Sequence, residues 1–306
     1  MKRPEITRRH LIASGAALTG AAAIGLAGST FAQDATPVPN STPGEGSPAA
    51  TPATPVPQTP IRVAEWPFYG NGIERTKFTD ASGITAGNVA NLQLAWTGTV
   101  GGPISSTPVI AEGLVVVGSY DGKLRAYDPD TGAETWALET GAAVMEPNLH
   151  IPLGITGSAA IDNGVVYTGD ATGKLWAVNA ATGETVWSAE PDAQSAASIW
   201  SSPVVADGVL YVGIASVAKE AGFRGAVVAV DAGTGEMIWD TYVTPEGSDG
   251  GGVFAVPALD RERGILYVGT QNAYSADVSS DSHVLSIIAL KMESGEVVWS
   301  FSGVPS

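Results

Sequence analysis

The stretch that decides the fold is Asp231-Ala-Gly-Thr-Gly-Glu-Met-Ile-Trp239, a turn followed by Gly-Glu-x-x-Trp. It recurs as Asp128-Pro-Asp-Thr-Gly-Ala-Glu-Thr-Trp136, Asn179-Ala-Ala-Thr-Gly-Glu-Thr-Val-Trp187 and Lys291-Met-Glu-Ser-Gly-Glu-Val-Val-Trp299. With an earlier Trp96, the steps between successive tryptophans are 40, 51, 52 and 60 residues. Periods of roughly 40–50 residues are typical of propeller blades or of solenoid units.

The inside of each repeat distinguishes these two architectures. A strand that opens on Pro or Ala is followed by a tight turn and an apolar strand. The predicted apolar strands are Leu114–Gly118, Val165–Gly169, Val209–Gly213 and Ile265–Gly269. Glu-Gly, Asn-Gly and Asp-Gly turns precede the first three, and Asn-Gly and Asp-Gly between apolar runs indicate two-residue hairpins. A third strand, the Thr-Gly or Ser-Gly turn and a fourth strand carrying the Trp complete each repeat.

Four antiparallel strands per repeat, without a helical period, predict an all-β fold, a β-propeller of four-stranded antiparallel blades. Four blades and an opening strand around Trp96 are present. The alternative is a β-sandwich whose segments are similar by coincidence. A large ring at the same place in every blade can wedge between neighbouring sheets, so the four repeated tryptophans are predicted to belong to the core.

The N-terminus is predicted to be an export signal. Residues 1–32 contain Arg8-Arg9, a mildly apolar Ala/Gly-rich stretch and small residues before a cleavage point after Ala32, a pattern that resembles a twin-arginine signal. The alternative is an uncleaved membrane anchor. Residues 33–60 are rich in Pro, Thr, Ser and Ala and are predicted to form an extended linker. Residues 61–306 are then the repeat domain, and we expect no membrane span once the signal is cleaved.

Composition excludes several functions. The 306 residues include 15 Lys and Arg against 31 Asp and Glu, a formal net charge of −16, so nucleic-acid binding is not expected. There is no cysteine, which excludes disulfides, thiolate zinc sites and thiol catalysis. The three histidines are scattered along the chain and indicate no zinc or copper site.

The repeats resemble the tryptophan-docking repeats of quinoproteins, the dehydrogenases that use pyrroloquinoline quinone (PQQ). The segment Trp66-Pro-Phe-Tyr-Gly-Asn-Gly, Arg75 and the run from Gly83 to Trp96 are similar to the N-terminal part of PQQ-dependent alcohol dehydrogenases. The resemblance covers residues 61–306 and implies part of an eight-bladed propeller. Either the sequence is a fragment, the N-terminal half of such an enzyme, or a partner chain or second copy completes the ring. An open half-propeller would leave unpaired faces, and we favour the fragment.

The resemblance also implies a calcium site. Lys219-Glu-Ala-Gly-Phe-Arg-Gly225 matches the family segment in which the Glu is a calcium ligand, which assigns Glu220. Tyr267-Val-Gly-Thr-Gln-Asn272 matches the strand followed by an Asn ligand, which assigns Asn272. Carboxylate and amide oxygens suit a hard cation, but calcium takes 6–8 oxygens, and the quinone would supply more. The alternative is that both are polar residues of a hairpin.

Aromatic residues are predicted to face the central channel. When the first strands are aligned, the residues three before Pro108, Ala159, Pro203 and Pro257 are Ser105, Thr156, Trp200 and Phe254. The family places an aromatic floor under its planar quinone, so Trp200 and Phe254 are the candidate cofactor-binding residues. Phe254 stands where alcohol-oxidising members carry Trp. The alternative is an aromatic plug that fills the channel.

Two functions remain open. The first is a PQQ- and calcium-dependent dehydrogenase that oxidises an alcohol or sugar, with calcium as Lewis acid, a carboxylate as base and a separate electron acceptor. The family's catalytic Asp belongs to a blade beyond Asn272 that is not present, so no catalytic residue is assigned. The family's vicinal cysteine pair and a haem motif are also absent from this sequence. The second is a cofactor-free scaffold that binds other proteins. In both, the protein is exported to the periplasm, the cell surface or the medium.

Overall fold

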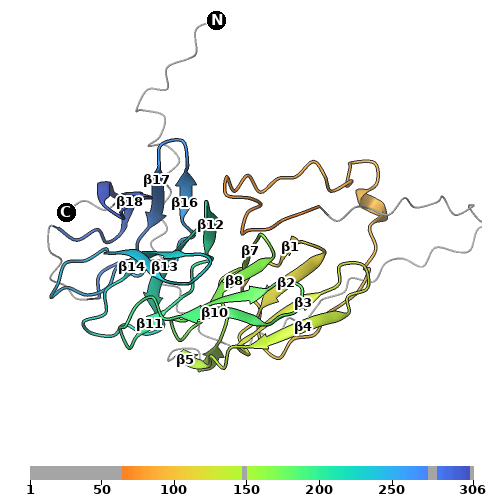
Figure 1. The fold of residues 1–306 in the computed structure, drawn as a ribbon, viewed down its shortest axis with the longest axis horizontal. Coiled ribbons are helices and arrows are strands. Elements are labelled where there is room, and N and C mark those ends of the chain that lie inside the picture. Colours follow the sequence, from red (N-terminus) through yellow and green to blue (C-terminus); the bar gives the residue numbers. More distant parts are fainter. Residues whose placement is uncertain (1–63, 147–149, 275–280, 304–306) are drawn as a thin grey trace, which may run out of the picture. The chain divides into compact units, whose positions relative to one another are not determined.

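The structure is a computed structural model that describes residues 64–146, 150–274 and 281–303. Its strands form four successive antiparallel sheets, here called blades 1 to 4, which Figure 1 shows from yellow to blue along the chain. The predicted signal and linker, residues 1–60, lie outside the described residues. The described residues are therefore nearly all β, as the sequence predicted.

In blades 1, 2 and 4, neighbouring strands follow one another along the chain. Blade 1 contains β1 (Val109–Ala111), β2 (Leu114–Gly118), β3 (Lys123–Tyr127) and β4 (Glu134–Glu139). Blade 2 contains β7 (Ala160–Asp162), β8 (Val165–Gly169), β9 (Leu175–Asn179) and β10 (Thr185–Ala189). Blade 3 contains β11 (Ala197–Ser198), β12 (Val204–Ala206), β13 (Val209–Ser216), β14 (Ala226–Asp231) and β15 (Met237–Tyr242). Blade 4 contains β16 (Ala258–Asp260), β17 (Ile265–Gly269), β18 (Ser286–Lys291) and β19 (Val297–Ser302).

The predicted apolar strands are confirmed, with one extension. Three of them coincide with β2, β8 and β17, whereas the strand predicted over Val209–Gly213 continues to Ser216 as β13. The extra residues pair with β11, so blade 3 has five strands rather than four. A small hairpin of β5 (Val144–Glu146) and β6 (Ile151–Leu153) between blades 1 and 2 was also not predicted.

The predicted two-residue hairpins are present. Asn163 and Gly164 have φ of 47° and 78°, and the corresponding Glu-Gly and Asp-Gly turns repeat this pair of positive angles. Positive φ at both central residues gives a turn whose twist matches that of the flanking strands. The local sequence therefore fixes the register between the two strands that flank each turn: β1 and β2, β7 and β8, and β12 and β13.

Three of the repeated tryptophans, Trp136, Trp187 and Trp239, each connect their own strand to the next blade. The indole Nε1–H of Trp136 donates to the Ala180 carbonyl at 2.7 Å, and that of Trp187 donates to the Ala232 carbonyl at 3.0 Å. In every blade the ladder shifts register just before the tryptophan. Such a bulge re-aims the side chain that follows it. The ring thereby reaches the turn of the following blade.

The prediction that all four repeated tryptophans are core is wrong for Trp299. Trp136 and Trp239 are each 8% exposed, whereas Trp299 is 45% exposed. The ring of Trp299 lies on the last described blade, where no following turn covers it among the residues the structure describes. Trp96 makes the same contact as the others, donating to the Pro129 carbonyl at 2.8 Å, although residues 92–100 form no strand.

Apolar side chains from neighbouring blades form three clusters, one at each junction between blades. The segment that precedes blade 1 contacts the first strands of blades 1 and 2 and the residues just before the first strand of blade 4. Trp66 forms a bridge with Ile110 of β1, and the Pro67 carbonyl accepts from the Ile161 N–H of β7 at 2.9 Å. Arg75 Nη1 donates to the Val256 carbonyl, just before β16, at 2.6 Å. This segment therefore connects blades 1, 2 and 4.

Candidate functional site

The loops that lead into the first strands contact one another from blade to blade. Ser105 Oγ donates to the Thr156 carbonyl at 3.0 Å. Between blades 3 and 4, the ring centroids of Trp200 and Phe254 lie 5.0 Å apart with an interplanar angle of 40°. The alignment of first strands therefore placed corresponding residues next to one another, and the two predicted aromatic residues form a ring pair.

The ring pair borders a cavity of about 720 Å³, here called the aromatic cavity. Trp200 and Phe254 are both partly buried. The remaining lining comes from the loop after β13 and the loop after β17: Ser216, Val217, Ala218, Lys219, Gln271, Asn272 and Tyr274. A cavity of this size, with aromatic walls and a few convergent polar groups, is typical of small-molecule sites.

Asn272, predicted as a metal ligand, lines this cavity. Its Nδ2 donates to the Ala273 carbonyl at 2.6 Å, which orients the amide. Among the described residues, no hydrogen bond is made to its Oδ1, so this oxygen is available to a ligand or cation. The structure therefore brings Asn272, Trp200 and Phe254 to one cavity.

Hydrogen bonds of Ser216 join the loop after β13 to the loop after β17. Ser216 Oγ lies 2.5 Å from the Ala218 carbonyl and 2.9 Å from the Tyr274 hydroxyl. A carbonyl only accepts, so the single Ser216 proton goes to Ala218, and Tyr274 must donate to Ser216. The Ala218 carbonyl also accepts from the Glu220 N–H at 2.9 Å. Tyr274, two residues after Asn272, thus restrains the loop that carries Glu220.

Glu220 lines different cavities. Its side chain is exposed, borders two smaller cavities of about 180 and 260 Å³, and does not line the aromatic cavity. Its Oε1 lies 3.5 Å from Ser195 Oγ, in the connection between blades 2 and 3. The second of these cavities shares Val217 and Ala218 with the aromatic cavity. Glu220 is therefore a neighbour of the aromatic cavity rather than part of its lining.

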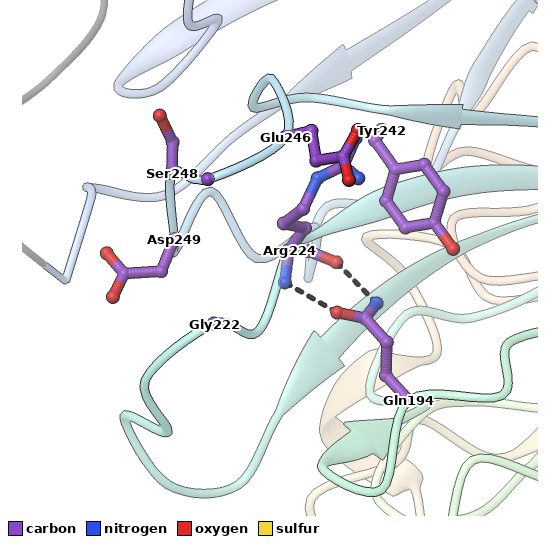
Figure 2. Close-up of a pocket in the computed structure, with 8 residues that line it drawn as sticks. Gln194, Gly222, Arg224, Tyr242, Glu246, Ser248 and Asp249 are labelled. Atoms are coloured by element: carbon purple, nitrogen blue, oxygen red, sulfur yellow. Dashed lines mark hydrogen bonds between the residues drawn. The ribbon is translucent and has the colours of Figure 1, made fainter.

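A third side chain holds the same loop from the side of blade 2. Figure 2 shows the Gln194 amide bound to the backbone of Arg224, with Oε1 accepting from the N–H at 2.8 Å and Nε2 donating to the carbonyl at 2.9 Å. The Arg224 guanidinium lies 4.0 Å from the Tyr242 ring centroid and donates to the Thr244 carbonyl at 3.0 Å. Burial, with the nearby carboxylates of Asp192 and Asp240, raises the pKa of Tyr242. The loop 217–225 is thus anchored at both ends.

Sequence reasoning missed four polar lining residues of the aromatic cavity, Ser216, Lys219, Gln271 and Tyr274, together with Val217 and Ala218. Lys219 and Gln271 directly precede the predicted ligands Glu220 and Asn272, so proximity to those motifs was the available signal. Periodicity could not reveal them, because they lie in loops that differ from blade to blade. In the described ranges, no group of three or more His, Cys, Asp or Glu side chains is placed to hold a metal ion.

The fold and the tryptophan contacts define a β-propeller built of PQQ-type tryptophan-docking repeats. The model of the PQQ_2 family, described as outer membrane protein assembly factor BamB, matches residues 78–301. The chain therefore belongs to the PQQ_2 family. None of the helices in the described residues is both long and apolar enough to cross a membrane.

The chain is also similar to quinoprotein dehydrogenases. It is 28% identical over 263 residues to a polyvinylalcohol dehydrogenase of Pseudomonas sp, covering 77% of this chain and 40% of that protein. It is 27% identical over 301 residues to the quinohemoprotein alcohol dehydrogenase ADH IIB of Pseudomonas putida, covering 85% and 43%. The crystal structure of quinohemoprotein alcohol dehydrogenase from Comamonas testosteroni matches with a TM-score of 0.69 and 26% identity, covering 79% and 41%. The chain thus spans less than half the length of these relatives.

Proposed function

We propose that this chain forms the N-terminal half of a PQQ- and calcium-dependent dehydrogenase that oxidises an alcohol or a sugar. The observation that carries this proposal is the aromatic cavity, where Trp200, Phe254 and Asn272 from two neighbouring blades line one space. The similarity to polyvinylalcohol and quinohemoprotein alcohol dehydrogenases supports it.

The chemistry of the lining fits a planar quinone. The two aromatic rings offer flat apolar surfaces, and the cavity of about 720 Å³ lies within the range of roughly 300–1,000 Å³ usual for such sites. The Asn272 oxygen is an acceptor or ligand without a protein partner among the described residues. Calcium would need further oxygens, which Glu220, the quinone and residues of additional blades would supply.

The residues have separate tasks in this proposal. Trp200 and Phe254 hold the flat face of the quinone and exclude water from it. The Asn272 oxygen would be a ligand of the cation. Tyr274 and Ser216 hold the loop from which the Glu220 carboxylate would approach the same cation. When bound, PQQ accepts the hydride equivalent from the substrate. We assign no base among the described residues, in keeping with a base supplied by a further blade.

The remaining features are proposed on the sequence alone. Residues 1–32 direct export through a twin-arginine route, and residues 33–60 form a linker to the repeat domain. The enzyme then works outside the cytoplasm and passes electrons to a separate acceptor. A downstream segment or a partner chain supplies the missing blades.

Titration of the full chain with PQQ in the presence of calcium tests the proposal. We expect saturable binding, seen as a change in the quinone absorbance spectrum, that Trp200→Leu weakens at least tenfold. Trp299→Leu is the matched control, because Trp299 is exposed and lies outside the cavity. Dye reduction with alcohols and sugars then tests catalysis in the chain completed by its further blades. Absence of PQQ binding both in this chain and in the chain completed by its further blades would reject the proposal.

The second candidate is a cofactor-free scaffold that binds other proteins outside the cytoplasm. It is favoured by the description of the family model as outer membrane protein assembly factor BamB. The same titration separates the two candidates, because a scaffold has no reason to bind PQQ and calcium in a manner that depends on Trp200.

A further inference from the structure

The aromatic cavity contains one charged side chain among its lining residues, and that side chain is a lysine. Lys219 lines the cavity together with Trp200 and Phe254, and the lining includes no Asp or Glu. The neighbouring carboxylate of Glu220 borders the two smaller cavities instead. Lys219, rather than the predicted metal ligand Glu220, is therefore the charged residue that lines the aromatic cavity.

Lys219 is also the lysine that lacks a protein partner in the described part of the chain. The others there form ion pairs, Lys123 with Glu139, Lys174 with Glu190 and Lys291 with Glu296, or lie over a ring, Lys77 over Tyr69. Lys219 is exposed, so its side chain is accessible to a ligand that arrives from solvent. A ligand with a negative charge would provide the missing partner.

We propose that the aromatic cavity binds a planar aromatic carboxylate and that Lys219 pairs with its carboxylate. The rings of Trp200 and Phe254 take the flat face of the ligand, and the Nζ of Lys219 donates to an oxygen at its edge. Without this cation, the net charge of −16 would disfavour an anionic ligand. The proposal rests on the proposed function only for the identity of the ligand, PQQ, which is itself an aromatic carboxylate.

The loop geometry explains why the Lys219 backbone keeps this position. Ser216 donates to the carbonyl of Ala218, the residue directly before Lys219, and Tyr274 donates to Ser216. Gln194 holds the backbone of Arg224 at the far end of the same loop. The ammonium therefore extends from an anchored backbone.

Calorimetric titration of the full chain in EDTA tests the pairing without any metal. The probes are PQQ, quinoline-2-carboxylate and its neutral analogue quinoline-2-carboxamide. We expect Lys219→Met to weaken both carboxylates about tenfold at low salt and to leave the amide unchanged. Lys219→Arg keeps the charge and should bind both within threefold of the unsubstituted chain. Lys291→Met removes the same charge outside the cavity and should change neither affinity.

The outcomes separate this inference from the proposed function. If quinoline-2-carboxylate binds through Lys219 and PQQ does not bind, the cavity is an anion site and the quinone function fails. If PQQ binds only with calcium and equally well to Lys219→Met, the quinone function stands and the pairing is refuted. Failure of both carboxylates to bind, or binding no tighter than that of the amide, also overturns the pairing.

Discussion

The contact between a tryptophan and the next turn predicts a large difference between two glycine-to-alanine substitutions. Gly183 and Gly208 have nearly the same backbone conformation, with φ of +75° and +78°. An alanine Cβ at position 183 would lie 2.7 Å from Cγ of Trp136, whereas one at position 208 would meet nothing within 4 Å. The pair therefore separates backbone strain from the cost of displacing the indole.

The magnitudes follow from these contacts. Positive φ costs an alanine roughly 1–2 kcal/mol at either position. At position 183, overpacking against a ring in a close-packed junction adds about 2 kcal/mol. Displacing the ring also weakens the Trp136 Nε1–H bond to the Ala180 carbonyl, worth about 1 kcal/mol. We expect Gly183→Ala to lower the free energy of unfolding by about 3 kcal/mol more than Gly208→Ala does.

Urea unfolding followed by far-ultraviolet circular dichroism measures both changes in one protein background. Backbone ellipticity is the suitable signal, because indole fluorescence would report the ring displacement as well as unfolding. Equal losses for the two variants would refute the reasoning, since Trp136 would then contribute nothing at the turn. A double-mutant cycle with Trp136→Leu and Gly183→Ala tests the same contact. In the Trp136→Leu background, the extra cost of Gly183→Ala in the free energy of unfolding should largely disappear.

Three further predictions concern single side chains. Burial alone would raise the pKa of Asp121, but hydrogen bonds from Arg125 and other donors lower it well below its ordinary value of 3.8. The ionised Asp121 carboxylate therefore stabilises the fold above its ordinary pKa, and this stabilisation is lost as the pH falls toward the lowered pKa of the folded state. Asp121→Asn should lower the melting temperature near pH 7 and should lose less stability than the unsubstituted chain on acidification. An unchanged acid dependence of the melting temperature would contradict this. Tyr274→Phe removes the hydroxyl that donates to Ser216. We expect it to weaken calcium binding to the PQQ-loaded chain about fivefold in calorimetry, with a melting temperature close to that of the unsubstituted chain. An unchanged calcium affinity would show that the loop is held without the Tyr274 hydroxyl. Burial lowers the pKa of Arg75 to about 10, and its Nη2 has no hydrogen-bond partner. Arg75→Met should therefore lower the free energy of unfolding in urea by less than about 1 kcal/mol. A loss of about 3 kcal/mol would show that the charge itself is required.

Much of the fold could be predicted because its signals are local. Asn163-Gly164 specifies a hairpin through the backbone conformation of two adjacent residues, and the apolar runs on either side define its strands. The repeated Gly-Glu-x-x-Trp pattern located the last strand of every blade. The sequence did not predict β11 or the β5–β6 hairpin, since both depend on how far a neighbouring strand extends rather than on a pattern of their own.

The candidate site was predictable only in part. Trp200 and Phe254 were found because aligned first strands place corresponding residues side by side, and the structure pairs their rings. Asn272 was assigned by resemblance and lines the same cavity, and its role as a metal ligand stays a prediction. The prediction of Glu220 as its companion in a metal site stays a prediction, because Glu220 borders neighbouring cavities instead.

By itself, the sequence determined the blades, their turns and the tryptophans that join them, since these depend on residues close together in the chain. Only the tertiary structure decided which charge faces the aromatic cavity. That choice between Lys219 and Glu220 depends on a loop held by Tyr274 from blade 4 and by Gln194 from the side of blade 2. Contacts between residues so far apart in sequence leave no periodic signal, so which of two adjacent residues lines the cavity is decided only when the blades pack together.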